Sequence, residues 1–317
     1  METFYYLVQQ MMFFTVPLLI VALGGMFSER SGIVNVALEG IMIFGAFCSV
    51  LFLNFTQDFI SGQFQLLLAL LVAAASGALI SLLHAYASVN MRANQVISGT
   101  AINLLAPAFA IYTARIIFGV QQIGFVNTFR IAKVPILGDI PFIGPMFFQK
   151  CYITTYLGFI ILAISYVVLY KTRFGLRLRA CGEHPQAADS VGINVYKMRY
   201  AGTIISGILG GIGGLVFIVP VTTQFNASVA GYGFLALAVL IFGNWKPIPI
   251  LWAALFFGMM KTLSAAYSGI PFLLNLGIPN VVFKVIPYIA TLVVLAFTSK
   301  NSAAPRAEGV PYDKGQR

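Results

Sequence analysis

Charged residues are scarce in this chain of 317 residues. Asp, Glu, Lys and Arg together make up 9% of it, whereas hydrophobic residues make up 59%, and the mean hydropathy is +0.91. A water-soluble single domain needs far more polar surface than these residues supply. The shortage of charge therefore excludes a soluble globular protein and indicates a protein that crosses a membrane several times.

Cysteine and histidine are also rare. Cys48, Cys151 and Cys181 are scattered and odd in number, so no disulfide framework is indicated, and neither His84 nor His184 lies in a metal-ligand spacing. The chain also lacks a G-x-x-x-x-G-K-[ST] phosphate loop. We therefore expect no catalytic residue, no metal and no cofactor, and any ATP that is used must be hydrolysed by another chain.

Apolar runs of about 20 residues, each enough for one bilayer crossing, recur along the chain. They predict an all-α transmembrane bundle of nine spans, with eight to ten allowed, in a single domain over residues 1–300. The spans are residues 4–26, 32–53, 64–88, 95–118, 152–170, 200–220, 229–243, 247–268 and 279–298. The tail, residues 301–317, has few apolar residues and is predicted to be a disordered or loosely docked cytoplasmic segment.

The net charge of +10 lies in short gaps between apolar runs. Nucleic-acid binding is not favoured, because it needs cations gathered on one face. Lys and Arg are instead retained on the cytoplasmic side during insertion. With residues 171–199 in the cytoplasm, Arg30, Arg92 and Lys246 also lie inside, and the N-terminus is outside and the C-terminus inside. The gaps that fall outside then carry no Lys or Arg: 54–63, 221–228 and 268–280.

The gap over residues 119–151 departs from this charge pattern. It would carry Arg130, Lys133 and Lys150 outside, although long loops follow the charge rule less strictly. Its three prolines predict an ordered external cap or a partial re-entrant segment.

Two features bear on how the spans pack. SGIVNVALEGIMIFG (31–45) and VAGYGFLALAVLIFG (229–243) share an Ile-Phe-Gly ending and would run in opposite directions, which is typical of an inverted repeat. Chance similarity between apolar sequences explains this match equally well. The cluster SGILGGIGG (206–214) contains two G-x-x-x-G pairs, and residues 73–78 are all small, so both runs predict closely packed helices.

Glu39 lies inside the predicted span 32–53, where an ionised carboxylate is costly unless it faces water or a partner. Asn35, four residues earlier, would share its helical face and form one polar stripe. Two interpretations remain open. Glu39 either lines a solute path, or it is a packing anchor that bonds to a neighbouring helix or pairs with Arg30 or Lys246. Weaker candidates for a path are Phe44, Asn103 and Phe242.

Residues 171–202 form the longest polar stretch within the apolar part of the chain. They carry six Lys and Arg residues against only Glu183 and Asp189. Roughly 30 polar residues between two spans gain nothing in lipid, so the stretch predicts a cytoplasmic docking element rather than a simple connector.

Three motifs carry a family resemblance. They are ERSGIVNVALEGIM (29–42), TRFGLRLRACGEHPQAADSVGI (172–193) and GYGFLALAVLIFGNWKP (231–247), in that order. Together they resemble the membrane subunits of ABC importers for branched-chain amino acids, ribose and other simple sugars, and nucleosides. The first motif is similar to the nucleoside or simple-sugar branch. His184 departs from the asparagine expected after Gly-Glu.

The resemblance implies that the polar stretch holds a coupling helix that fits a groove on a separate ABC ATPase. Pro185 suits the first turn of such a helix, and Gly192 can end it. The residues assigned to ATPase coupling are Gly182, Glu183, His184, Pro185, Ala187, Ala188, Asp189 and Gly192.

The resemblance further implies a bacterial cytoplasmic membrane protein that acts with several partners. These are two ATPases, a second and different permease subunit, an extracytoplasmic solute-binding lipoprotein and the membrane lipid. The small polar solute is expected to be a nucleoside, with Phe44 and Phe242 facing the base and Asn35 and Asn103 bonding the ribose. Simple sugars and branched-chain amino acids are the alternatives.

Two other classes of protein were weighed. In an ion-gradient-driven carrier, Glu39 would be the proton or sodium site and the chain would transport alone. An integral membrane enzyme would need convergent acids, bases or metal ligands at one membrane depth, and the sequence offers none.

Overall fold

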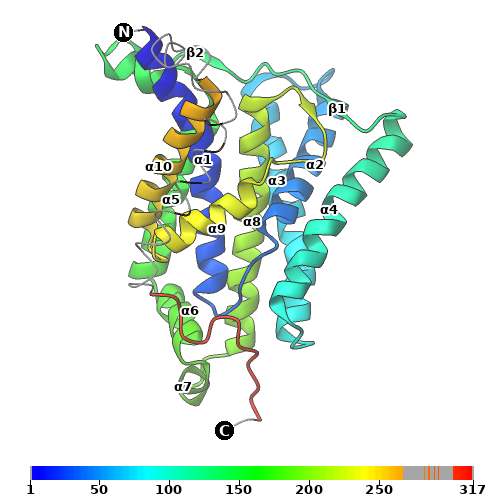
Figure 1. Cartoon of the computed structure of the whole chain (residues 1–317), viewed down its shortest axis with the longest axis vertical. Coiled ribbons are helices and arrows are strands. Elements are labelled where there is room, and N and C mark those ends of the chain that lie inside the picture. The colour runs from blue at the N-terminus through cyan, green and yellow to red at the C-terminus, as the bar shows by residue number, and fades with distance from the viewer. Residues whose placement is uncertain are drawn as a thin grey trace.

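The computed structural model describes residues 2–266 and 303–315, together with positions 282, 285, 289 and 292. Long helices run side by side along the longest axis of the molecule (Figure 1). Seven of them are long and apolar enough to cross a membrane, which confirms the all-α transmembrane bundle. They are α1 (Glu2–Glu29), α2 (Leu38–Thr56), α3 (Gly62–Val89), α4 (Gln95–Phe118), α5 (Ile153–Lys171), α8 (Val195–Val221) and α10 (Pro247–Ala266).

These seven helices correspond to seven of the nine predicted spans. The predicted span 229–243 forms α9 (Tyr232–Phe242), which has 11 residues. At 1.5 Å per residue it is roughly 16 Å long, about half of the hydrocarbon core. The predicted span 279–298 lies outside the described residues except at positions 282, 285, 289 and 292.

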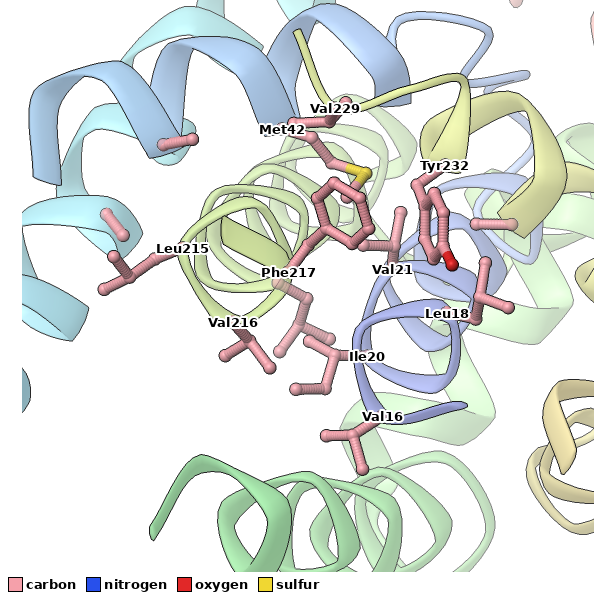
Figure 2. Packing of buried hydrophobic residues seen from close by; sticks show 14 of the residues in the cluster. Val16, Leu18, Ile20, Val21, Met42, Leu215, Val216, Phe217, Val229 and Tyr232 are labelled. Carbon is pink, nitrogen blue, oxygen red and sulfur yellow. The ribbon is translucent and has the colours of Figure 1, made fainter. Parts of the chain in front are cut away.

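Helix α1 lies in the middle of the bundle and α4 lies at its edge. In the most apolar stretch of α1, 89% of residues are buried, against 22% in α4. Figure 2 shows Val16 and Ile20 of α1 near Val216 of α8, and Val21 of α1 near Phe217 of α8. The Phe217 and Tyr232 rings lie 4.1 Å apart between centroids, so the start of α9 packs on the centre of the bundle.

Glycines allow α8 to approach α2 and α3 closely. A Cβ atom added to Gly77 of α3 would lie 2.1 Å from the Gly207 carbonyl oxygen, and one on Gly211 would lie 2.1 Å from that of Ala73. A Cβ on Gly214 would lie 2.1 Å from the Met42 oxygen of α2. The predicted helix packing through these small residues is therefore confirmed.

Two small antiparallel sheets lie at the end of the bundle that holds the N-terminus (Figure 1). Strand β1 (Ile123–Gly124) pairs with β4 (Gln224–Phe225), and β2 (Ile131–Lys133) pairs with β3 (Gln149–Cys151). Between β2 and β3 lie a 3-10 turn, Leu137–Asp139, and a π turn, Gly144–Phe148. Residues 119–151 thus form an ordered segment, as predicted from their prolines.

Two short helices lie at the opposite end, the α7 end of the bundle (Figure 1). They are α6 (Arg173–Glu183) and α7 (Pro185–Ser190). Residues 303–315 lie at the same end and contain neither helix nor strand. The sequence predicted this tail to be disordered or loosely docked.

Candidate functional site

Residues 30–37, which lie between α1 and α2, are not helical. We call them the broken segment. A continuous helix was predicted from residue 32, and this boundary is wrong. The added Cβ of Gly40, two residues after α2 begins, would lie 2.6 Å from the Ile102 oxygen of α4. Ile102 is seven residues from the start of α4, so α2 begins roughly 10 Å inside the bundle.

Side chains from other helices bond the backbone of the broken segment. The Val34 N–H donates to Gln95 Oε1 at 2.7 Å, and the Val34 oxygen lies 3.0 Å from His84 Nε2. Asn103 Nδ2 donates to the Val36 oxygen at 2.9 Å, and its Oδ1 accepts from the Gly40 N–H at 2.7 Å. Backbone that is not helical is tolerated at membrane depth only when protein groups or a water-filled cavity satisfy it.

Glu39 joins the start of α2 to the start of α9. Its carboxylate accepts from the Gly231 N–H at 3.0 Å and from the Gly233 N–H at 2.6 Å. The first N–H groups of a helix have no partner within the helix and carry partial positive charge. Glu39 therefore caps α9 from a different helix, and the starts of α2 and α9 meet at one carboxylate.

If Glu39 is a packing anchor, the sequence allows two kinds of partner for it, a neighbouring helix or a cation, and the structure distinguishes these two. Its bonds to α9 fit an anchor on a neighbouring helix, and among the described residues no cation forms an ion pair with it. Pairing with Arg30 or Lys246 is therefore wrong. The predicted polar stripe is wrong as well, because Asn35 precedes the helix and donates to Ser206 Oγ of α8 at 2.8 Å.

The five predicted path residues fall into two groups. Asn35, Glu39 and Asn103 lie around the start of α2, and Phe44 follows on α2 with its ring 5.7 Å from that of Phe109. Phe242 ends α9, and its ring lies 5.3 Å from that of Phe257 of α10.

His84, Gln95 and Ser206 were not predicted to belong to this site. Each is a buried polar side chain in a largely apolar helix. A polar side chain in such a helix needs a hydrogen-bond partner, and this is the one signal that could have found these residues. Within the described part of the chain, no group of three His, Cys, Asp or Glu side chains is placed to hold a metal.

Helix α7 forms where the sequence predicted a short helix. Pro185 occupies its first turn, and Gly192, with φ +83°, follows its end in the left-handed region that favours glycine. Helix α6 was not predicted, and Thr172 caps it by accepting from the Gly175 N–H at 3.1 Å.

The eight predicted coupling residues divide by exposure. His184, Ala187 and Gly192 are exposed, whereas Gly182, Pro185 and Ala188 are buried against the rest of the α7 end. A Cβ on Gly182 would lie 2.3 Å from the Arg30 oxygen, so α6 packs directly on the broken segment. Val191, which was not predicted, is 74% exposed beside α7.

Arg30 connects the α7 end to the broken segment and to the loop after α9. Its Nη1 lies 3.6 Å from Glu183 Oε1 at the end of α6, and its Nε and Nη2 donate to the Trp245 oxygen at 3.2 and 3.1 Å. Trp245 follows α9, and its indole Nε1 donates to Glu29 Oε2 at 2.5 Å. Arg30 therefore contacts both the end of α6 and the loop after α9.

The tail, residues 303–315, crosses the same end of the bundle. The Ala307 N–H donates to the Gly182 oxygen at 2.9 Å, and the Gly309 N–H donates to the Gly32 oxygen at 3.2 Å. Asp313 accepts two bonds from Arg92, at 2.6 and 2.9 Å. The tail thus contacts α6, the broken segment and the loop between α3 and α4.

Comparison with known proteins places the sequence of this chain in a family. The model of the family described as the permease component of branched-chain amino acid transport systems matches residues 7–295. The guanosine ABC transporter permease NupQ of Bacillus subtilis is 48% identical over 96% of this chain and 95% of its own length. The nucleoside ABC transporter permease NupC of Lactococcus lactis is 42% identical over 99% of both chains.

A second Lactococcus lactis protein, the nucleoside ABC transporter permease NupB, is 29% identical over 51% of this chain and 44% of its own length. No solved structure matches the chain.

Proposed function

The chain belongs to the family of permease components of branched-chain amino acid transport systems, and we propose that it is the membrane subunit of an ATP-driven importer of nucleosides. It is a transport subunit and not an enzyme. The observation that carries the proposal is the set of contacts of Arg30, which links the end of α6 to the broken segment and to the loop after α9.

The α7 end is suited to receive an ATPase. Helix α7 is short, and His184, Ala187 and Val191 are exposed on and beside it. Gly182, Pro185 and Ala188 hold the helix against the bundle, and Glu183 and Asp189 form ion pairs with Arg30 and Lys314, the latter at 3.9 Å. The exposed residues would contact the ATPase, and the buried ones would transmit its movement to the bundle.

The path for the solute would run beside the joined starts of α2 and α9. Discontinuous helices near mid-membrane form the substrate sites of many transporters. When the ATPases close, a shift of α6 would move Arg30, and with it the broken segment and the loop after α9. Alternating access then follows from a change in which side of the membrane the path faces.

The remaining partners and the orientation follow from this role. Lactococcus lactis has two nucleoside permeases that both resemble this chain, which supports pairing with a second, different permease subunit. The α7 end would face the cytoplasm, where ATP is available, and the N-terminal end would face a solute-binding lipoprotein outside. Cation placement in the gaps supports this orientation.

Nucleosides are the proposed solute because both long, high-identity relatives are named for them. Phe44 offers an aromatic face for a base, and Asn35 and Asn103 offer amides for ribose hydroxyls. Asn35 Oδ1 is buried without a hydrogen-bond partner, so this oxygen could accept a hydrogen bond from a ribose hydroxyl.

Uptake of labelled solutes tests the class of substrate. A strain that lacks this chain and the same strain with the chain restored are given labelled purine nucleosides, ribose and branched-chain amino acids. Restoration of nucleoside uptake alone supports the proposal. Restoration of ribose or amino acid uptake without nucleoside uptake contradicts it.

A further inference from the structure

Two adjoining cavities lie outside the proposed solute path, where α5 ends and α10 begins. The first has a volume of about 480 Å³ and is lined by Tyr166, Tyr170 and Lys171 of α5 and by residues 246–249. The second has a volume of about 530 Å³ and lies along α10. Ile248 and Pro249 line both cavities, so the two adjoin at the start of α10.

The first cavity is positively charged. Lys171 is the last residue of α5, Lys246 immediately precedes α10, and both are exposed. Neither lysine belongs to an ion pair among the described residues, and no carboxylate lines the cavity. The Arg179 guanidinium lies 4.9 Å above the Tyr170 ring, and its buried Nε has no bonding partner. Two lysines therefore line the cavity without an ion pair among the described residues, and Arg179 lies beside its Tyr170 wall.

The second cavity is apolar along its whole length. Its lining beyond the shared residues is Phe242, Trp252, Ala253 and Phe256, and Trp252 is 67% exposed. Phe256 follows Pro249 by seven residues of α10, so the groove extends roughly 10 Å from the helix end toward the middle of the membrane. The combined site is cationic at the helix ends and apolar along the helix.

We propose that these cavities bind one anionic phospholipid from the leaflet at the α7 end. Its phosphate would lie between Lys171 and Lys246, with the tyrosine hydroxyls as further donors, and one acyl chain would fill the groove along α10. Lysines at helix ends reach the headgroup level of a bilayer, and basic pockets between helices are suited to anionic headgroups. A free phosphate would leave the apolar cavity unfilled, and a zwitterionic headgroup would bring an ammonium group near the lysines.

The site is tested on the full chain, purified with its co-purifying subunits, by native mass spectrometry. The probes are phosphatidylglycerol and phosphatidylcholine with identical acyl chains. The variant is Lys171→Gln with Lys246→Gln, and the matched control is Lys197→Gln, which replaces another exposed lysine of the α7 end. Two cations near a headgroup should favour the anionic lipid roughly 30-fold. We expect this preference in the native chain and the control and its loss in the double variant.

Two further arms separate lipid from free anion. Trp252→Ala, which opens the apolar groove, should weaken retention of phosphatidylglycerol without removing the preference for negative charge. Excess inorganic phosphate should fail to displace the lipid. Equal retention of the two lipids by the native chain, an unchanged preference in the double variant, or displacement by phosphate would each overturn the proposal.

Discussion

The broken segment and the α7 end are both rich in polar groups, but the first has them bonded inside the bundle and the second has residues exposed at the surface. In and just after the broken segment, the backbone of Val34 and Val36 and the carboxylate of Glu39 bond to groups from other helices. At the α7 end, His184, Ala187 and Val191 face outward. The polar groups of the first region are bonded inside the bundle, whereas the second region leaves side chains exposed at the surface. Arg30 connects the two.

The largest effect should come from removing the internal partner of α9. Replacing Glu39 with Ala leaves the N–H groups of Gly231 and Gly233 buried without acceptors, at a cost of about 1–3 kcal/mol each. We expect loss of nucleoside uptake and a lower melting temperature in detergent. Glu39→Gln retains an acceptor oxygen and should keep more of both. Wild-type uptake in Glu39→Ala would show that the joined helix starts are dispensable.

The outward-facing region should respond differently, with function lost and stability kept. Val191→Lys places a charge on an exposed apolar residue beside α7, so co-purification with the ATPase and ATP-driven uptake should both fall while the melting temperature stays unchanged. Val191→Thr, of similar shape, is the control. An intact complex in Val191→Lys would place the docking surface elsewhere.

The connection between the regions can be cut separately. Arg30→Ala removes two bonds to Trp245 and the ion pair with Glu183, so the ATPase should still bind and hydrolyse ATP while uptake falls. Glu183→Gln removes only the ion pair, whose carboxylate side chain is 42% exposed, and should cost about 0–1 kcal/mol. The ratio of solute transported to ATP hydrolysed measures both. An unchanged ratio in Arg30→Ala would contradict the connection.

The smallest effect concerns the tail. Burial raises the pKa of the Glu308 carboxyl, and the nearby Glu29 carboxyl and Arg30 guanidinium offset this only in part. A raised pKa in the docked state means that docking is favoured at low pH and is lost as pH rises through that pKa. Limited proteolysis should therefore cleave residues 303–315 faster at high pH. In Glu308→Gln this pH dependence should disappear, and its persistence would assign it to another group.

The sequence predicted those parts of the molecule that depend on local chemistry. Pro185 and Gly192 mark the limits of α7 because one residue fixes φ and the other permits positive φ. The glycines of 206–214 predicted the close packing of α8. Residues 33–45 are apolar apart from Asn35 and Glu39, so no local signal in this run placed the start of the helix at Leu38.

What the sequence could not predict depends on partners far apart in the chain. His84, Gln95 and Asn103 satisfy the backbone of the broken segment with hydrogen bonds. Glu39 accepts a hydrogen bond from Gly231, which lies 192 residues away in the sequence. The contacts of the tail were also not predictable from local sequence. Its composition indicates little order, but Asp313 accepts hydrogen bonds from Arg92, which lies 221 residues away in the sequence.

Transport by reconstituted protein tests the central claim most directly. Accumulation of labelled guanosine is measured in proteoliposomes that contain this chain with its partner permease, with and without the ATPase and ATP. The account predicts accumulation against the gradient only when both the ATPase and ATP are present. Accumulation without the ATPase, driven by a proton or sodium gradient, would contradict it.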